Sequence, residues 1–111
     1  MTEKQPNPFL GRWKITEMDV WDQEYVDLVA PGFIKFAKDN LGEFRFGTVR
    51  GFLDCRIEAY GDENRIEFSW DGENDSDPGH GRGWAAIRGG QLFGHLYIHM
   101  CDDSWFKAEK K

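Results

Sequence analysis

The sequence predicts an all-β fold: an antiparallel up-and-down barrel or strongly curved sheet of about eight strands, with one short helix after the first strand. Apolar side chains alternate with polar or small ones in short runs along most of the chain. Turn residues such as Gly, Asp and Asn separate these runs at short intervals. A single segment, residues 21–29, has a helical period instead.

Length and charge limit the possible organisation and partners. The 111 residues suffice for one domain with a single core, and we expect it to span residues 9–111 behind a mobile polar arm of residues 1–8. The chain has 20 Asp and Glu against 14 Lys and Arg, so its net charge of -6 repels phosphate backbones and anionic lipid. We therefore expect neither nucleic acid nor membrane as a partner.

We expect a cytoplasmic protein without a cofactor. No apolar run approaches the roughly 20 residues of a membrane helix, and residues 1–8 lack the apolar centre of a signal peptide. Cys55 and Cys101 should be free thiols, because a disulfide is unusual in a reducing compartment, and their spacing matches no zinc motif.

The first half of the domain predicts a strand, a helix and two more strands. Odd positions 9–15 are apolar or glycine, whereas positions 12, 14 and 16 are polar, so the odd face of the first strand should be buried. Residues 21–29 place apolar side chains on one side of a helix that Pro31 and Gly32 end. Ile34 and Phe36 then share one strand face, Phe44 and Phe46 share another, and residues 39–42 form the turn between them.

The second half predicts five further strands with a buried stripe on each. After a turn at residues 61–64, an acidic connection over residues 71–79 should be a solvated hairpin loop, because Ser76 and Arg82 occupy the positions where an EF-hand needs Gly and Glu. The expected inward residues are Leu53, Cys55, Ile57 and Ala59; Ile66, Phe68 and Trp70; Gly83, Ala85 and Ile87; Leu92, Leu96, Ile98 and Met100; and Phe106 and Ala108.

Two turns set the pairing of the last three strands. A two-residue turn at Gly89-Gly90 pairs Gly83 with Leu96 and places apolar or small residues opposite each other throughout. In the last hairpin, a two-residue turn would bring Lys107 onto the buried face. We therefore expect a three-residue turn over 101–103, which pairs Ile98 with Phe106 and Leu96 with Ala108.

Gly11-Arg12-Trp13, on the first strand of an up-and-down β chain, resembles the Gly-x-Trp signature of lipocalins and their calycin relatives. That resemblance implies a calycin-like barrel that carries a small hydrophobic ligand. The remaining lipocalin motifs are missing. Three other stretches resemble a group of small bacterial proteins of unassigned function: Phe68-Ser-Trp-Asp-Gly, Gly81-Arg-Gly-Trp-Ala and Asp102-Asp-Ser-x-Phe.

The outer face of the last three strands is the candidate site. The expected pairing places Trp84 beside His95, Arg82 beside Tyr97 and His80 beside His99, with Trp105 next to His99 and Lys107 next to Tyr97. Exposed aromatic clusters usually mark contact surfaces. Two alternatives remain: the helix or the arm covers the rings, or inside and outside are inverted and the rings line the lumen. The candidate residues are Trp84, Phe93, His95, Tyr97, His99 and Trp105.

Two further groups could bind a ligand. His80 and His99, if directly opposed, have Cβ atoms about 5 Å apart, close enough to share a metal ion or a proton, although paired surface histidines often have no role. The inward rings are read either as filled core, which we favour, or as the lining of a pocket. These lumen candidates are Trp13, Phe44, Phe68 and Trp70.

Three functions follow, in order of preference. The first is a non-enzymatic binding module that forms a homodimer through the outer face of its last three strands, since Ser69 and Ser104 lack the Gly-x-Ser-x-Gly setting of a nucleophile. The second is a carrier of a small hydrophobic ligand, which requires a cavity of at least about 300 Å³ next to Trp13. The third is a metal or acid/base site at His80 and His99.

Overall fold

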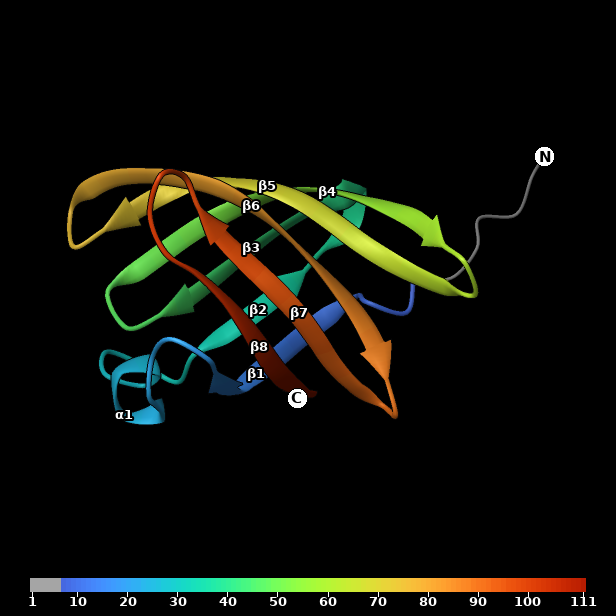
Figure 1. Cartoon of the computed structure of the whole chain (residues 1–111), viewed down its shortest axis with the longest axis horizontal. Coiled ribbons are helices and arrows are strands. Elements are labelled where there is room, and N and C mark those ends of the chain that lie inside the picture. The colour runs from blue at the N-terminus through green and yellow to red at the C-terminus, as the bar shows by residue number, and fades with distance from the viewer. Residues whose placement is uncertain (1–6) are drawn as a thin grey trace.

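The computed structural model describes residues 7–111, which form a closed antiparallel barrel (Figure 1). Each of its eight strands pairs with the next, and β8 pairs with β1. The predicted fold class is therefore confirmed. Because the sheet closes on itself, it is a barrel and not an open curved sheet. Residues 1–6 of the expected arm lie outside the described part. The elements are β1 (Gly11–Met18), α1 (Gln23–Val26), β2 (Phe33–Phe36), η1 (Lys38–Asn40), β3 (Leu41–Phe46), β4 (Val49–Tyr60), β5 (Glu63–Asn74), β6 (Asp77–Arg88), β7 (Gln91–Ile98) and β8 (Asp103–Lys110).

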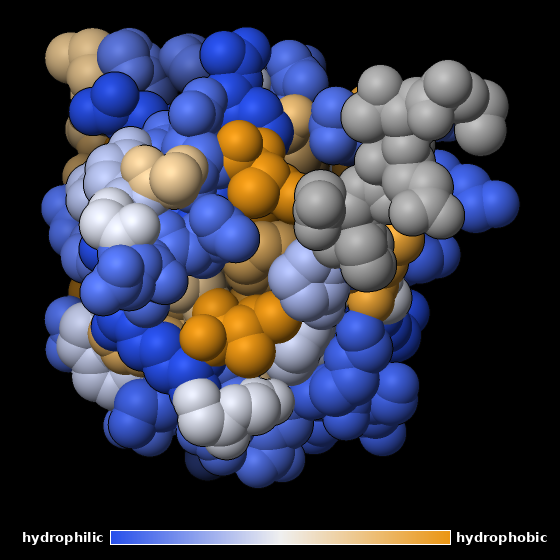
Figure 2. Space-filling view, turned by 90° about the vertical axis from the view of Figure 1, so that its right-hand side faces the viewer, coloured by the Kyte–Doolittle hydropathy of each residue, from blue (hydrophilic) through white to orange (hydrophobic). Residues whose placement is uncertain are grey.

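The strands differ greatly in length, which makes the molecule elongated. Strands β4, β5 and β6 have 12 residues each, whereas β2 has four, and the molecule measures 45 × 27 × 23 Å. The long hairpins project beyond the barrel (Figure 1). The predicted burial of Ile57 and Ala59 is wrong for this reason: both lie on the projecting end of β4, and Ile57 is 42% exposed. The view onto this end shows hydrophobic side chains that reach the surface among hydrophilic ones (Figure 2).

The acidic connection is not a loop. Strand β5 continues to Asn74 and β6 begins at Asp77, so the turn consists of Asp75 and Ser76 alone. Both turn residues have positive φ, 50° and 76°, as in the type I′ turns whose twist matches that of paired strands. The predicted solvated loop is thus wrong in conformation, although its side chains are exposed.

The pairing of β6 with β7 is as predicted, and that of β7 with β8 is not. Gly83 pairs with Leu96 across the Gly89-Gly90 turn, as expected. In the last hairpin, however, Leu96 pairs with Ser104 instead of Ala108. The turn lies earlier, where the Ile98 N–H donates to the Asp102 carbonyl at 3.0 Å and Met100 has a φ of 57°. Met100, predicted to point inward, is therefore 93% exposed at the turn.

The displaced turn changes the cross-strand partners of the β8 residues but not the face of the sheet on which each residue lies. Ala108 pairs with Leu92, four residues before its predicted partner. Because side chains alternate with a period of two, an even displacement keeps every residue on its original face. Phe106 and Ala108 accordingly point inward and are buried, as predicted.

The helix is shorter than the predicted residues 21–29. The Asp22 side chain accepts a hydrogen bond from Tyr25 N–H at 2.9 Å and caps the first turn, but the helix ends at Val26. Leu28 and Val29, expected on its apolar side, are 63% and 59% exposed. No helix in residues 7–111 has the length and hydropathy of a membrane span.

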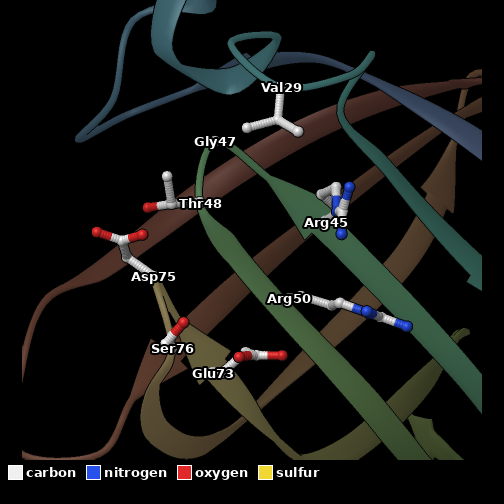
Figure 3. A pocket seen from close by; sticks show the side chains of 8 residues that line it. All are labelled: Val29, Arg45, Gly47, Thr48, Arg50, Glu73, Asp75 and Ser76. Carbon is white, nitrogen blue, oxygen red and sulfur yellow. The ribbon is translucent and has the colours of Figure 1, made fainter.

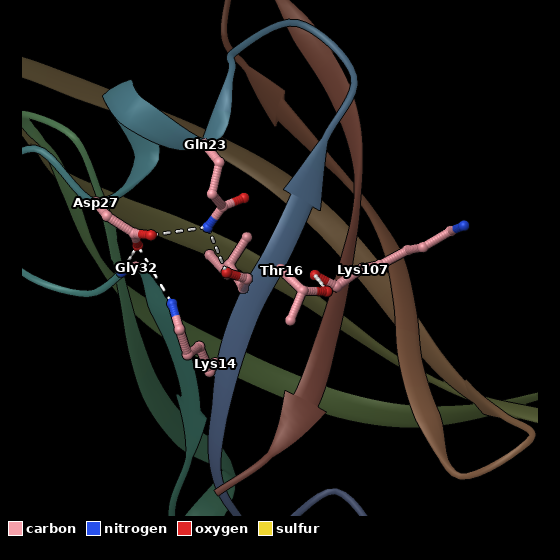
Figure 4. A network of polar contacts seen from close by, with 7 residues as sticks. Lys14, Thr16, Gln23, Asp27, Gly32 and Lys107 are labelled. Carbon is pink, nitrogen blue, oxygen red and sulfur yellow. Dashed lines mark hydrogen bonds and ion pairs between the residues drawn. The ribbon is translucent and has the colours of Figure 1, made fainter.

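Asp27, just after the helix, ties this segment to the barrel (Figure 4). Its carboxylate accepts hydrogen bonds from Gly32 N–H at 2.8 Å and Gln23 Nε2 at 3.0 Å, and it lies 3.4 Å from Lys14 Nζ. Desolvation raises the pKa of Asp27, but these hydrogen bonds and the charge of Lys14 outweigh it and leave the pKa below its usual value. Gln23 Nε2 also donates to the Ile15 carbonyl at 3.0 Å, so α1 is fixed against β1.

Candidate functional site

Aromatic side chains fill the barrel interior. All four lumen candidates, Trp13, Phe44, Phe68 and Trp70, point inward and are buried. The Phe44 ring packs edge-on against Trp70 at 5.1 Å and stacks on Phe46 at 5.8 Å between ring centroids. The space left among these rings is about 10 Å³, lined by Ile15, Met18, Ile34, Phe44, Phe46, Leu96 and Phe106.

Glycines in the barrel wall make room for the inward rings. An added Cβ would lie 2.5 Å from the Phe44 ring at Gly51, and 2.6 Å from Phe68 and Phe106 at Gly83 and Gly94. Such distances are far below ordinary van der Waals contact. Gly83, Gly51 and Gly94 therefore each make room for a core ring.

The filled interior leaves no room for a carried ligand. A space of 10 Å³ holds about one water molecule at most, whereas a ligand pocket has about 300 Å³ or more. Trp13 itself has a structural role at the barrel end: its Nε1 donates to the Phe9 carbonyl at 2.9 Å, and Lys110 Nζ lies 4.7 Å from its ring centroid.

The outer surface of β6, β7 and β8 carries a group of half-buried rings, which we name the ring face. Their neighbours Leu92 and Leu96 are fully buried on the opposite face, so the alternative in which these rings line the lumen is wrong. Helix α1 does not cover them either, because it packs on β1 and its neighbour Trp21 lies 4.7 Å from Phe46. The ring face consists of Trp84, Phe93, His95, Tyr97 and Trp105.

The rings shield one another. Phe93 lies 6.2 Å from both Trp84 and Trp105, and His95 stacks on Tyr97 at 4.6 Å between centroids. Trp105 pairs with His95, rather than with His99 as predicted, because of the displaced β7–β8 turn. For the same reason Lys107 pairs with Phe93 instead of Tyr97. Of the six candidate residues, five form the ring face, and His99 lies at its end, where it lines a hollow together with Tyr97.

Arginines lie over these rings, a feature that the sequence pattern did not reveal. The guanidinium carbon of Arg65 is 4.0 Å from the Trp84 ring centroid, and that of Arg88 is 4.9 Å from Phe93. Glu63 holds both arginines, since it accepts from Arg88 Nε and a terminal nitrogen at 2.8 and 3.0 Å and from Arg65 Nε at 3.2 Å. The hydrogen bonds from Arg88 lower the pKa of Glu63 to about 2.

His80 and His99 meet at one end of the ring face, as predicted. Their rings stack with centroids 4.5 Å apart and planes 26° apart, beside an open hollow of about 460 Å³ that Arg82 and Tyr97 also line. Nearly parallel imidazoles direct their lone pairs side by side, so a shared metal ion would require one ring to rotate. Residues 7–111 contain no group of three His, Cys, Asp or Glu side chains placed to hold a metal ion. A role for this pair stays a prediction.

Two free thiols and one buried serine hydroxyl lie outside the ring face. Cys55 and Cys101 are free, the first buried and the second exposed. Burial, reinforced by the charge of Asp54, raises the pKa of Cys55 to about 12, so this thiol stays protonated. Ser104 is fully buried, and its Oγ accepts hydrogen bonds from Asp19 and Val20 N–H at 3.0 and 3.1 Å, which is a structural role.

Comparison with protein-family models, with curated proteins and with solved structures finds no match to this chain. The resemblances to calycins and to small bacterial proteins therefore rest on the quoted residues and, for calycins, on the eight-stranded barrel alone.

Proposed function

We propose that the protein is a non-enzymatic, cytoplasmic binding module that forms a homodimer through its ring face. One observation carries the proposal: the cavity inside the barrel is about 10 Å³, while five rings gather on the outer surface of β6, β7 and β8. A barrel without a ligand-sized internal cavity has to bind partners on its outer surface.

The composition of the ring face supports a protein contact. Interface cores are enriched in Trp, Tyr, Phe and Arg, and the residues whose truncation costs most affinity are usually Trp, Tyr and Arg. Here Arg65 and Arg88 lie over Trp84, Arg82 lies near Tyr97, and Lys107 lies near Trp105. Because the arginines are already held over the rings, little side-chain freedom is lost on binding.

The surrounding charges suit a second copy of the same chain. A two-fold interface brings one surface against itself, so it needs both signs of charge on the same patch. The outward positions of β6 and β8 provide them: Arg82 and Arg88 lie on β6, and Asp103 and Glu109 lie on β8 across the rings, with Lys107 between these two carboxylates. Rotation by 180° places the acidic edge of one copy opposite the basic edge of the other.

The test is the molar mass in solution, measured by size-exclusion chromatography with light scattering over a range of concentrations. We expect a dimer, and we expect Trp105→Ala to raise its dissociation constant about 30-fold, the effect of losing a central anchor. Phe52→Ala is the matched control, because Phe52 is a 55% exposed ring on the outer face of β4, away from the ring face.

Thermal denaturation shows whether each variant remains folded. A wild-type chain that is monomeric at the highest concentration contradicts the proposal. So does a folded Trp105→Ala variant that dimerises as tightly as the Phe52→Ala control.

A further inference from the structure

A second surface, on the other side of the barrel, gathers basic side chains that are scattered in the sequence. On the outer face of β1–β4, Lys14 pairs with Phe33, Phe33 with Arg45, and Arg45 with Arg50. In the adjacent row Arg12 pairs with Lys35. We call Arg12, Lys14, Lys35, Arg45 and Arg50, which surround Phe33, the basic strip.

Most of these charges have no acidic partner. Within residues 7–111, Lys14 is the member of the basic strip that forms an ion pair, with Asp27. Arg45 and Arg50 are directly opposed across β3 and β4, an arrangement that is destabilising for like charges. An anion bound between them would remove that repulsion.

Acidic side chains flank Phe52 and the margins of the strip. Phe52 lies between Glu43 on β3 and Asp71 on β5, while Glu73 pairs with Arg50 at the β5 edge and Glu109 with Lys14 at the β8 edge. The net charge of -6 is therefore unevenly distributed over the surface.

Arg45 and Arg50 also line an open hollow of about 240 Å³ (Figure 3). Both guanidinium groups point to the same side, away from Asp75 on the β5–β6 turn. Thr48 and Ser76 contribute hydroxyl groups to the lining, and Glu73 and Asp75 contribute carboxylates. Two arginines that face one way can bind one phosphate or two successive phosphates.

An exposed ring follows this pair along β4. Phe52 lies two residues after Arg50 on the same face, a separation of about 6.8 Å along the strand, and is 55% exposed. A cation and a ring in alternation match the phosphate and base of a nucleotide chain. An acidic peptide would use the cations but would leave the ring without a partner.

We propose that the basic strip binds single-stranded nucleic acid, with phosphates on Arg45 and Arg50 and a base stacked on Phe52. Proteins that bind single strands without sequence preference combine a positively charged track with aromatic platforms. The negative net charge predicts that nucleic acid is not a partner, and this proposal departs from that prediction. It does not depend on the ring face.

The experiment is fluorescence anisotropy with a labelled ten-nucleotide oligothymidylate at several salt concentrations. If four cations of the strip contact phosphates, log K falls with log salt with a slope of about -3. Arg45→Gln/Arg50→Gln should weaken binding at least about tenfold at low salt and bring the slope to about -1.4. Phe52→Ala should weaken binding about fivefold or more and leave the slope unchanged.

Lys38→Gln/Arg56→Gln is the matched control, since it removes two exposed cations that belong neither to the basic strip nor to the ring face. It should bind like the wild type. The Arg45→Gln/Arg50→Gln variant should also be at least as stable as wild type to heat, because it removes a repulsion. Absence of binding at 50 mM salt, equal losses in both double variants, or equally tight binding of polyglutamate or phosphatidylserine vesicles would overturn the proposal.

Discussion

The molecule has two populations of large rings, one on each side of the same barrel wall, and their neighbours differ. Inward rings such as Phe44 and Phe68 meet other rings and the bare backbone of glycines. Outward rings such as Trp84 and Phe93 lie beneath arginines. The inner rings are fully buried, whereas the outer ones remain accessible. The same side-chain chemistry thus builds a core on one face and a contact surface on the other.

The difference shows what determines the role of a ring in a small barrel. Its side of the wall follows from its position in the alternation of the strand. What it does there depends on its neighbours in the sheet: a glycine paired with it across the strands makes room for an inner ring, and a basic side chain covers an outer one. We expect inner rings to control folding stability and outer rings to control association.

The largest effect should distinguish an inner from an outer ring. Phe44→Ala should lower the free energy of unfolding by about 3–5 kcal/mol, because it removes a buried ring and leaves a cavity. Phe52→Ala, the exposed counterpart, should lower it by about 0.5 kcal/mol or less. Urea denaturation measures both. If Phe44→Ala does not fold, Phe44→Leu should still lose about 1–2 kcal/mol. Equal losses at the two positions would contradict the distinction.

Substitution of a glycine in the barrel wall should have an intermediate effect on stability. A Cβ at Gly81 would lie 1.9 Å from the Tyr97 carbonyl oxygen and 2.8 Å from Trp70 Nε1, which donates to that same oxygen. Gly81→Ala should therefore cost about 1–3 kcal/mol of stability. At Gly79, two residues away, the new Cβ would meet Trp70 at an ordinary 3.6 Å. Gly79→Ala should be neutral or slightly stabilising. If it loses as much stability as Gly81→Ala, the close contacts of a Cβ at Gly81 are not the cause of the loss.

The smallest effect concerns the arginines over the outer rings. The pKa of Glu63 is lowered from 4.5 to about 2 by Arg88, so its stabilising contribution is fully present above pH 4.5 and is lost as the pH falls towards 2. Glu63→Gln should reduce the fall in melting temperature across this window, and added salt should narrow the difference because the pair is exposed. Glu58→Gln, on the neighbouring strand, is the control. Identical pH profiles for wild type and Glu63→Gln would show that the pair does not stabilise the fold.

The faces of the strands could be predicted from the sequence even where the pairing could not. The alternation predicts Phe106 and Ala108 in the interior, and they lie there although their predicted partners are wrong, because the displacement is even. Strand length was harder to predict. Ile57 continues the alternating pattern of Leu53 and Cys55, but its exposure depends on where neighbouring strands end. Met100 likewise continues the alternation of inward residues, but it is exposed because it lies in a turn.

The candidate site was predictable in part for the same reason. Alternation placed Trp84 and Tyr97 on one outer face, and a two-residue turn set their partners correctly. The basic strip gave no such signal: Arg12, Lys35 and Arg50 lie far apart in the chain, and only the pairing of four strands makes them neighbours. Local sequence patterns do not contain that information.

Closure of the barrel by β1 and β8 restricts how any partner can attach. Within residues 11–110 every strand has a hydrogen-bonded neighbour on both sides over part of its length, so the body of the barrel offers no free edge to which another chain could add a strand. A free edge remains on projecting ends such as residues 55–60 of β4, which pair with β5 but not with β3. Recognition by backbone pairing, a common route for β proteins, is thereby confined to these ends. On the body of the barrel affinity has to come from side chains, so mutations on the outside can alter partner choice while the hydrogen-bonded frame stays intact.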